Sequence, residues 1–167
     1  MKKILFTVLI FCLTSTITVL AQDSYVFKTG ISMINSVPKQ FFGTWQVSSN
    51  LISTNSSKTF KQKGSDFWNL RRSGNVIELK NPVTAAVAEI YLEDVTDREI
   101  VFTHYEKEGY TQIKDTVRLK LDGETFSGTN ELTLRTVRYD EYRKKYEDIK
   151  TAIYEIKGSK VSDTGLY

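Results

Sequence analysis

Two side chains near the middle of the sequence have the types needed for acid–base chemistry or for polar recognition. His104 is the only histidine, and Asp115 lies in the next stretch of alternating apolar and polar residues. An imidazole beside a carboxylate can move a proton in catalysis. The same pair could instead hold the polar head group of a ligand by hydrogen bonds. A single histidine excludes a metal site with several histidine ligands, and we predict neither a metal nor a cofactor.

Other catalytic signatures are absent from the sequence. It contains no Gly-rich phosphate loop and no Gly-x-Ser-x-Gly nucleophile elbow. An enzyme would have to use His104 and Asp115 alone as acid and base, so we predict a protein without catalytic activity. The single cysteine, Cys12, lies in a segment expected to be removed, which would leave no disulfide and no thiol nucleophile.

The elements that position these residues are predicted to be β-strands. From residue 40 onward, apolar residues alternate with polar ones and turn residues interrupt the pattern. Eight strands are expected, at residues 40–50, 66–72, 75–80, 86–94, 98–107, 110–121, 124–137 and 151–161. Pairing of the last strand with the first would remove both sheet edges. The predicted fold is all-β, an eight-stranded antiparallel up-and-down barrel.

Four turns set the expected register of this sheet, and three of them are Ser73-Gly74, Gly109 and Asp122-Gly123. A fourth is expected near Thr96-Asp97. The turns were placed separately, yet they agree on one inner face. The apolar residues expected on this inner face are Ile90, Leu92, Ile100, Phe102, Val117, Leu119, Phe126, Leu132 and Leu134.

The same register predicts a polar group inside the barrel. His104 and Asp115 point inward as diagonal neighbours, and Asn130 faces Asp115 from the following strand. Arg138, at the end of the seventh strand, could reach the mouth and bind an anion. The candidate ligand-binding residues are Trp68, Phe102, His104, Asp115, Asn130 and Arg138. The alternative is a structural network in which these polar groups satisfy one another.

The connections predict a barrel with one closed end and one open end. Tight turns follow the second, fourth and sixth strands, whereas the other end carries a long loop at residues 51–65. Tyr139, Tyr142, Tyr146 and Ile149 recur at helical spacing, which predicts a short helix over residues 138–150, before the last strand.

The N-terminal region indicates export. Lys2 and Lys3 precede an apolar run, and Ala21 marks a cleavage site, so residues 1–21 are predicted to be a signal peptide. We expect a secreted or periplasmic protein with no membrane span after cleavage. Residues 22–39 form an N-terminal extension, and residues 40–167 form the single barrel domain. Without the leader the charge is close to neutral, which argues against nucleic acid as a partner.

The opening strand resembles that of lipocalins and fatty-acid-binding proteins, in the calycin group of barrels. The shared segment is Phe42-Gly43-Thr44-Trp45 followed by Val47. The resemblance implies structural roles for Gly43 and Trp45, with Trp45 filling the barrel floor, and an interior that takes small apolar ligands. The sequence departs from the lipocalins in lacking their Thr-Asp-Tyr turn and in placing its helix before the last strand. Arg135 is the candidate for the arginine that lipocalins stack on this tryptophan.

Two functions follow from these patterns. The first is a lipocalin-like, non-catalytic binding protein for a small apolar ligand, secreted or periplasmic. The alternative is a protein-binding module, such as a periplasmic protease inhibitor or an envelope assembly factor, acting through residues 22–39 or through outward-facing side chains that could also form a homodimer. An open interior favours the first, and an interior filled by side chains favours the second.

Overall fold

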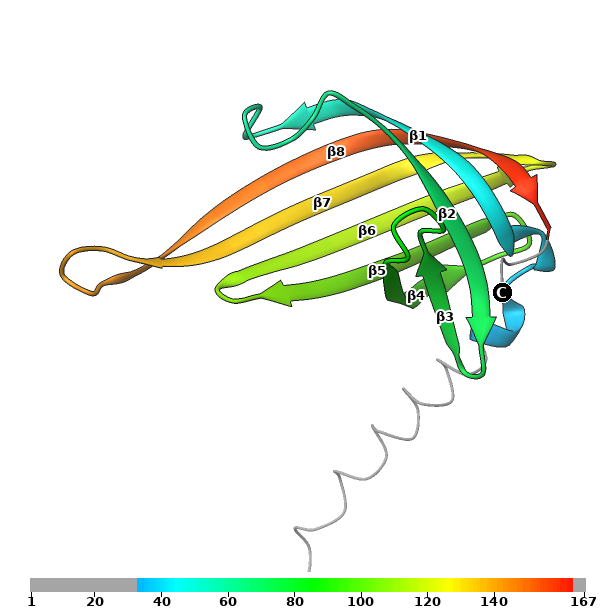
Figure 1. The fold of residues 1–167 in the computed structure, drawn as a ribbon, viewed down its shortest axis with the longest axis horizontal. Coiled ribbons are helices and arrows are strands. Elements are labelled where there is room, and N and C mark those ends of the chain that lie inside the picture. The colour runs from blue at the N-terminus through cyan, green and yellow to red at the C-terminus, as the bar shows by residue number, and fades with distance from the viewer. Residues whose placement is uncertain (1–32, 164–167) are drawn as a thin grey trace, which may run out of the picture.

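Eight antiparallel strands close into a barrel in chain order in the computed structural model, which describes residues 33–163 (Figure 1). The strands are β1 (Gly43–Thr54), β2 (Lys63–Ser73), β3 (Val76–Lys80), β4 (Val87–Val95), β5 (Glu99–Glu108), β6 (Thr111–Asp122), β7 (Thr125–Tyr139) and β8 (Lys145–Ser162). The predicted fold class is therefore confirmed. The expected signal peptide, its cleavage site at Ala21 and most of the N-terminal extension lie outside the described residues.

Pairing between β1 and β8 closes the ring along nearly the whole of β1, from Thr44 opposite Ser162 to Thr54 opposite Ala152. Gly43 begins β1 with φ +125°, a conformation that favours glycine. A Cβ atom at this position would lie 2.3 Å from the carbonyl oxygen of Ser162. The predicted structural role of Gly43 thus has a physical basis, since only a residue without a side chain lets the two ends of the sheet meet.

The register of three hairpins differs from the prediction by two residues. Gly74, Gly109 and Gly123 have φ values of 60°, 56° and 59°, and each occupies the first of the two central turn positions. The sequence interpretation placed each glycine second. A glycine at the first position is typical of type II′ turns, which suit the twist of a hairpin. Because side chains alternate with period two, a shift of two residues leaves the inner and outer faces unchanged.

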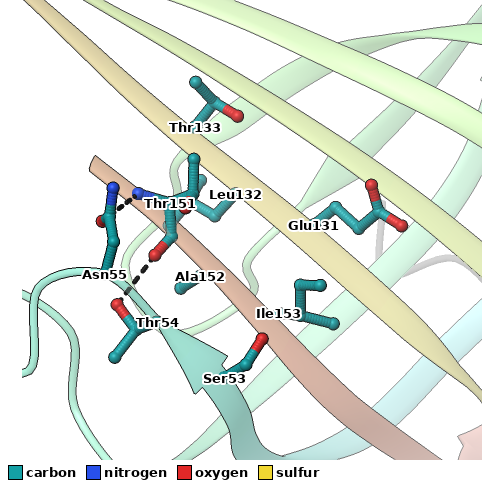
Figure 2. A pocket seen from close by; sticks show the side chains of 9 residues that line it. All are labelled: Ser53, Thr54, Asn55, Glu131, Leu132, Thr133, Thr151, Ala152 and Ile153. Atoms are coloured by element: carbon teal, nitrogen blue, oxygen red, sulfur yellow. Dashed lines mark hydrogen bonds between the residues drawn. The ribbon is translucent and has the colours of Figure 1, made fainter. Parts of the chain in front are cut away.

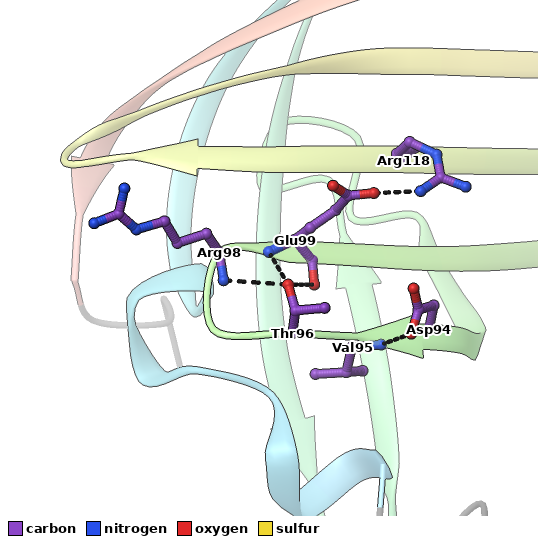
Figure 3. A network of polar contacts seen from close by, with 6 residues as sticks. All are labelled: Asp94, Val95, Thr96, Arg98, Glu99 and Arg118. Atoms are coloured by element: carbon purple, nitrogen blue, oxygen red, sulfur yellow. Dashed lines mark hydrogen bonds and ion pairs between the residues drawn. The ribbon is translucent and has the colours of Figure 1, made fainter.

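The turn between β4 and β5 is held by Thr96 (Figure 3). Its hydroxyl accepts hydrogen bonds from the backbone N–H groups of Arg98, at 3.4 Å, and Glu99, at 3.0 Å. Glu99 also forms an ion pair with Arg118 on β6. The pairing predicted for this hairpin is wrong, because Leu92 lies opposite Phe102 and not opposite Ile100. A β-bulge between Leu92 and Asp94 shifts the ladder by one further residue toward the turn.

The closed half of the barrel is filled by its own side chains. Trp45 is buried, its ring centroid lies 5.1 Å from that of Phe126, and its indole N–H donates to the carbonyl oxygen of Phe41 at 2.9 Å. Trp45 thus lies in the packed core beside Phe126, at the end where a plug was predicted. The buried core cluster consists of Val37, Phe41, Trp45, Val47, Leu70, Ile77, Ile90, Ile100, Phe102, Val117, Leu119, Leu121, Phe126 and Ile156.

A lysine occupies the position expected for an arginine on Trp45. The ammonium nitrogen of Lys160 lies 5.3 Å from the Trp45 ring centroid and donates to the carbonyl oxygen of Gln40 at 2.9 Å. Arg135 lies at the other end of the barrel, where it pairs with Glu147 at 2.7 Å. The assignment of Arg135 to this position is therefore wrong, and the cation comes from β8 instead of β7.

Helical residues precede the barrel. Residues 33–36 form one helical turn, and the 3₁₀ helix η1 (Lys39–Phe41) follows Pro38. Val37 and Phe41 are buried, and Ile34 packs against the core, so this segment covers the closed end. No helix in residues 33–163 is long and apolar enough to cross a membrane.

The segment 138–150 is not helical, which corrects the prediction for this region. Its ends belong to β7 and β8, which pair from Thr125 opposite Ser159 to Tyr139 opposite Lys145. Asp140 makes the connecting turn, since its carboxylate accepts the N–H groups of Tyr142 and Lys144. The spacing of these tyrosine and isoleucine residues favours a helix, but both residue types are also frequent in strands. The long pairing between β7 and β8 selects the strand conformation. The hairpin extends beyond the rest of the barrel (Figure 1).

Candidate functional site

A cavity of about 330 Å³ lies above the packed floor, on the side of the open end. Trp68 separates the two regions, because its ring stacks on Phe126 of the floor, with centroids 6.2 Å apart and an interplanar angle of 21°. The cavity is lined by Val47, Ser49, Gly64, Ser65, Asp66, Trp68, Asp115, Asn130, Leu132, Tyr154 and Ile156. It combines apolar walls with a small number of polar groups, as ligand sites do.

A second cavity, of about 400 Å³, adjoins the first at the open end of the barrel. The two share Asp66 and Trp68. His104 and Glu106 of β5 form one wall of the second cavity, and the β3–β4 connection forms another. Together the two cavities run from the aromatic floor to the open end of the barrel.

Asp115 is the central polar group of the first cavity. It lies directly opposite His104 in the β5–β6 pairing and diagonally from Asn130, which faces Val117. Burial raises the pKa of Asp115, while a hydrogen bond from the Asn130 side chain and the charge of His104 oppose the rise. One carboxylate oxygen, Oδ1, is buried and has no hydrogen-bond partner. The site therefore holds a carboxylate whose acceptor capacity is only partly used.

Tyr154 connects this cavity to the loop between β1 and β2. Its hydroxyl donates to the carbonyl oxygen of Lys61 at 3.1 Å, and burial raises its pKa. The same loop is attached to β8 through Asn55, so its position relative to the barrel is fixed at two points.

The structure brings together most of the residues that the sequence singled out. Trp68, Asp115 and Asn130 line the first cavity, and His104 lines the second beside Trp68. The diagonal placement predicted for His104 and the direct placement predicted for Asn130 are exchanged, because the hairpins are shifted by two residues.

Two predicted site residues lie elsewhere. Phe102 is 1% exposed and belongs to the packed core, so its side chain contributes to stability and does not line either cavity. Arg138 lies in the protruding part of the β7–β8 hairpin, with its guanidinium 3.7 Å from Asp148. Its expected position at the mouth assumed that the seventh strand ends near residue 137, whereas β7 continues to Tyr139 and carries Arg138 outward with the hairpin.

Asp66 and Tyr154 also line the first cavity but were not predicted as site residues. Both follow from the alternation of their strands, since Asp66 lies two residues before Trp68 and Tyr154 two residues before Ile156. Asp66 was overlooked because the second strand was predicted to begin at that residue, whereas β2 begins at Lys63.

A larger hollow, of about 480 Å³, lies where the end of β1 meets β7 and β8 (Figure 2). Glu131, Thr133 and Ile153, which line it, alternate with the inward-facing Leu132 and Ala152. This alternation places it on the outer wall of the barrel. Among its residues, Thr54 and Asn55 are already bonded to the backbone of Thr151, as Figure 2 shows. The inner cavity is therefore the better candidate site.

Comparison with known proteins gives no assignment, because no family model, curated protein or solved structure matches the chain. Within residues 33–163, no group of three or more His, Cys, Asp or Glu side chains is placed to hold a metal ion. The inner cavity is therefore the feature of the molecule that bears on its function.

Proposed function

We propose that this chain is a lipocalin-like, non-catalytic binding protein, secreted or periplasmic, that holds a small and largely apolar molecule inside its barrel. The observation that carries the proposal is the cavity between Trp68 and Asp115, above a floor packed with buried apolar side chains. Its volume lies within the range of small-molecule sites in proteins. Export rests on the predicted signal peptide.

The experiment that tests this function compares two substitutions of adjacent serines on β1. Ser49 lines the cavity, and Ser48 is exposed on the outer face. In Ser49→Phe the new ring occupies the cavity, whereas Ser48→Phe adds the same ring to the outer wall. The probe is N-phenylnaphthylamine, an uncharged aromatic molecule whose fluorescence increases in an apolar site.

We expect saturable binding of one probe per chain, weakened about tenfold or more by Ser49→Phe and unchanged by Ser48→Phe. Circular dichroism and a thermal unfolding curve check that both variants are folded. The proposal is wrong if the folded wild type shows no saturable signal, or if the two variants bind the probe equally well.

A second candidate is a protein-binding module, and exposed tyrosines at the open end favour it. Tyr110 and Tyr139 pack edge to face with ring centroids 6.2 Å apart, and Tyr142 nearby is 84% exposed. Tyrosine is frequent at protein interfaces. Sedimentation measures whether the chain forms dimers through this surface. Dimers that Tyr110→Ser and Tyr139→Ser abolish would support this candidate, and a monomer in all variants would count against self-association.

A further inference from the structure

The two inner cavities carry acidic but few basic side chains. Asp66 and Asp115 line the first, and Asp66 and Glu106 line the second. His104 is the single basic residue among the lining residues of either cavity, and neither lysine nor arginine is found among them. A ligand carboxylate placed here would face like charges at short range, whereas a cation would be attracted.

Asp115 offers an acceptor that the protein leaves unused. Its Oδ1 atom is buried without a partner, and Asn130 supplies only part of the hydrogen bonding that a carboxylate accepts. Asp66 differs, because its Oδ1 already accepts from the backbone of Phe67 at 2.8 Å and from Asn81 at 2.5 Å. A buried carboxylate with free acceptor capacity is costly unless a donor reaches it. Asp115 is therefore the group that a ligand donor would satisfy.

Trp68 provides an apolar surface for the rest of the ligand. Phe126 stacks on this ring at 6.2 Å and holds it in place. Val47, Leu132 and Ile156 complete the apolar wall. Indole rings attract both apolar groups and cations.

We propose that the molecule bound in this cavity is an amphiphilic amine, with its ammonium group at Asp115 and its apolar or aromatic body against Trp68. This inference rests on the proposed small-molecule function and specifies its ligand class. It selects amines over fatty acids and other carboxylates, which the acidic lining disfavours.

Three probes with the same body and different head groups test the choice of charge. Phenylbutylamine, phenylbutanol and phenylpentanoate, which all carry a phenylbutyl body, are titrated into the full mature chain by isothermal calorimetry, at low and at physiological ionic strength. We expect the amine to bind about tenfold or more tightly than the alcohol, and the alcohol more tightly than the carboxylate. The preference for the amine should be larger at low ionic strength.

Two carboxamide substitutions locate the effect. Asp115→Asn keeps the size of the side chain and removes its charge, so the affinity for the amine should fall to about that of the alcohol. Asp122→Asn makes the same change of net charge on an exposed residue at the closed end and should leave all three affinities unchanged. Circular dichroism confirms that both variants are folded.

The outcomes separate this inference from the proposed function. Equal binding of the three probes, tighter binding of the carboxylate, or unchanged amine binding in Asp115→Asn would overturn the amine assignment and leave a small-molecule site. Absence of binding by all three probes and by N-phenylnaphthylamine would overturn both.

Discussion

At the scale of single residues, the inner polar group was predictable in composition but not in exact geometry. Alternation identified His104, Asp115 and Asn130 as inward-facing, and alternation has only two outcomes for each residue. Which of them lie opposite one another depends on turn type. A glycine at the first instead of the second central position moves each partner by two residues, and the sequence carries little information on that choice.

Burial of Asp115 predicts a specific dependence of stability on pH. Because burial raises its pKa in the folded state, ionisation costs more in the folded chain than in the unfolded chain. The free energy of unfolding therefore falls as the pH rises above the pKa of aspartate in the unfolded chain, which is about 4. The fall ends once the pH has passed the higher pKa of Asp115 in the folded chain. Asp115→Asn removes this loss, so the free energy of unfolding of the variant, relative to wild type, should increase with pH from about 4 and then level off.

Urea unfolding at a series of pH values measures this difference. His104 faces Asp115 and Asp66 lines the same cavity, so the comparison is repeated in a His104→Gln background, which removes the facing charge. Asp122→Asn is the exposed control. A difference between wild type and Asp115→Asn that stays constant with pH, or falls as the pH rises, would contradict the prediction.

At the scale of elements, the eight strands were predictable, but the hairpin that residues 138–150 form was not, because these residues were predicted to be helical. Period-two alternation located all eight strands, because half-buried strands impose it directly on the sequence. Residues 145–150 also carry tyrosine and isoleucine at helical spacing, so the local pattern was ambiguous. Pairing with β7 decides it, and no local window of sequence contains that information.

Asn55 extends the β1–β8 ladder after β1 has ended. Its side-chain amide donates to the carbonyl oxygen of Ile149 at 3.0 Å, and its amide oxygen accepts the N–H of Thr151 at 2.8 Å. Asn55→Ala removes both hydrogen bonds and should reduce the free energy of unfolding by about 1 kcal/mol. The loss is no larger because the freed backbone groups can still bond to water. Amide hydrogen exchange at Thr151 should become faster.

The matched control for this prediction is Asn50→Ala, which removes an exposed amide from β1, five residues before Asn55. It should leave both the free energy of unfolding and the exchange rate of Thr151 nearly unchanged. Equal effects of the two substitutions would show that the Asn55 contacts do not stabilise the ladder.

At the scale of the whole molecule, the ring can close only if the start of β1 comes close to the end of β8, where Gly43 lies beside Ser162. The sequence indicated this position through Gly43 and Trp45. It did not identify the neighbouring cation, since Lys160 is distant in the chain and comes near only when the ring closes.

Gly43→Ala tests the contribution of closure to stability. The added methyl group would meet the carbonyl oxygen of Ser162 in a backbone conformation that alanine rarely adopts, so we expect a loss of about 2–4 kcal/mol. Gly74→Ala is the control, because Gly74 also has positive φ but nothing within 4 Å of the added Cβ. It should cost only about 1 kcal/mol. Chemical denaturation measures both, and equal losses would contradict a special role for the closure point.

The protruding end of the β7–β8 hairpin has a consequence for how the protein behaves at high concentration. Beyond Val137 of β7, the two strands pair with each other, and their outer main-chain groups face water. Such an edge could accept an extended segment of another chain and so begin a polymer. Opposite charges cross the hairpin at this edge, from Arg138 to Asp148, and just before it, from Arg135 to Glu147. An incoming strand would have to strip water from these ions, and this cost opposes polymerisation through the edge.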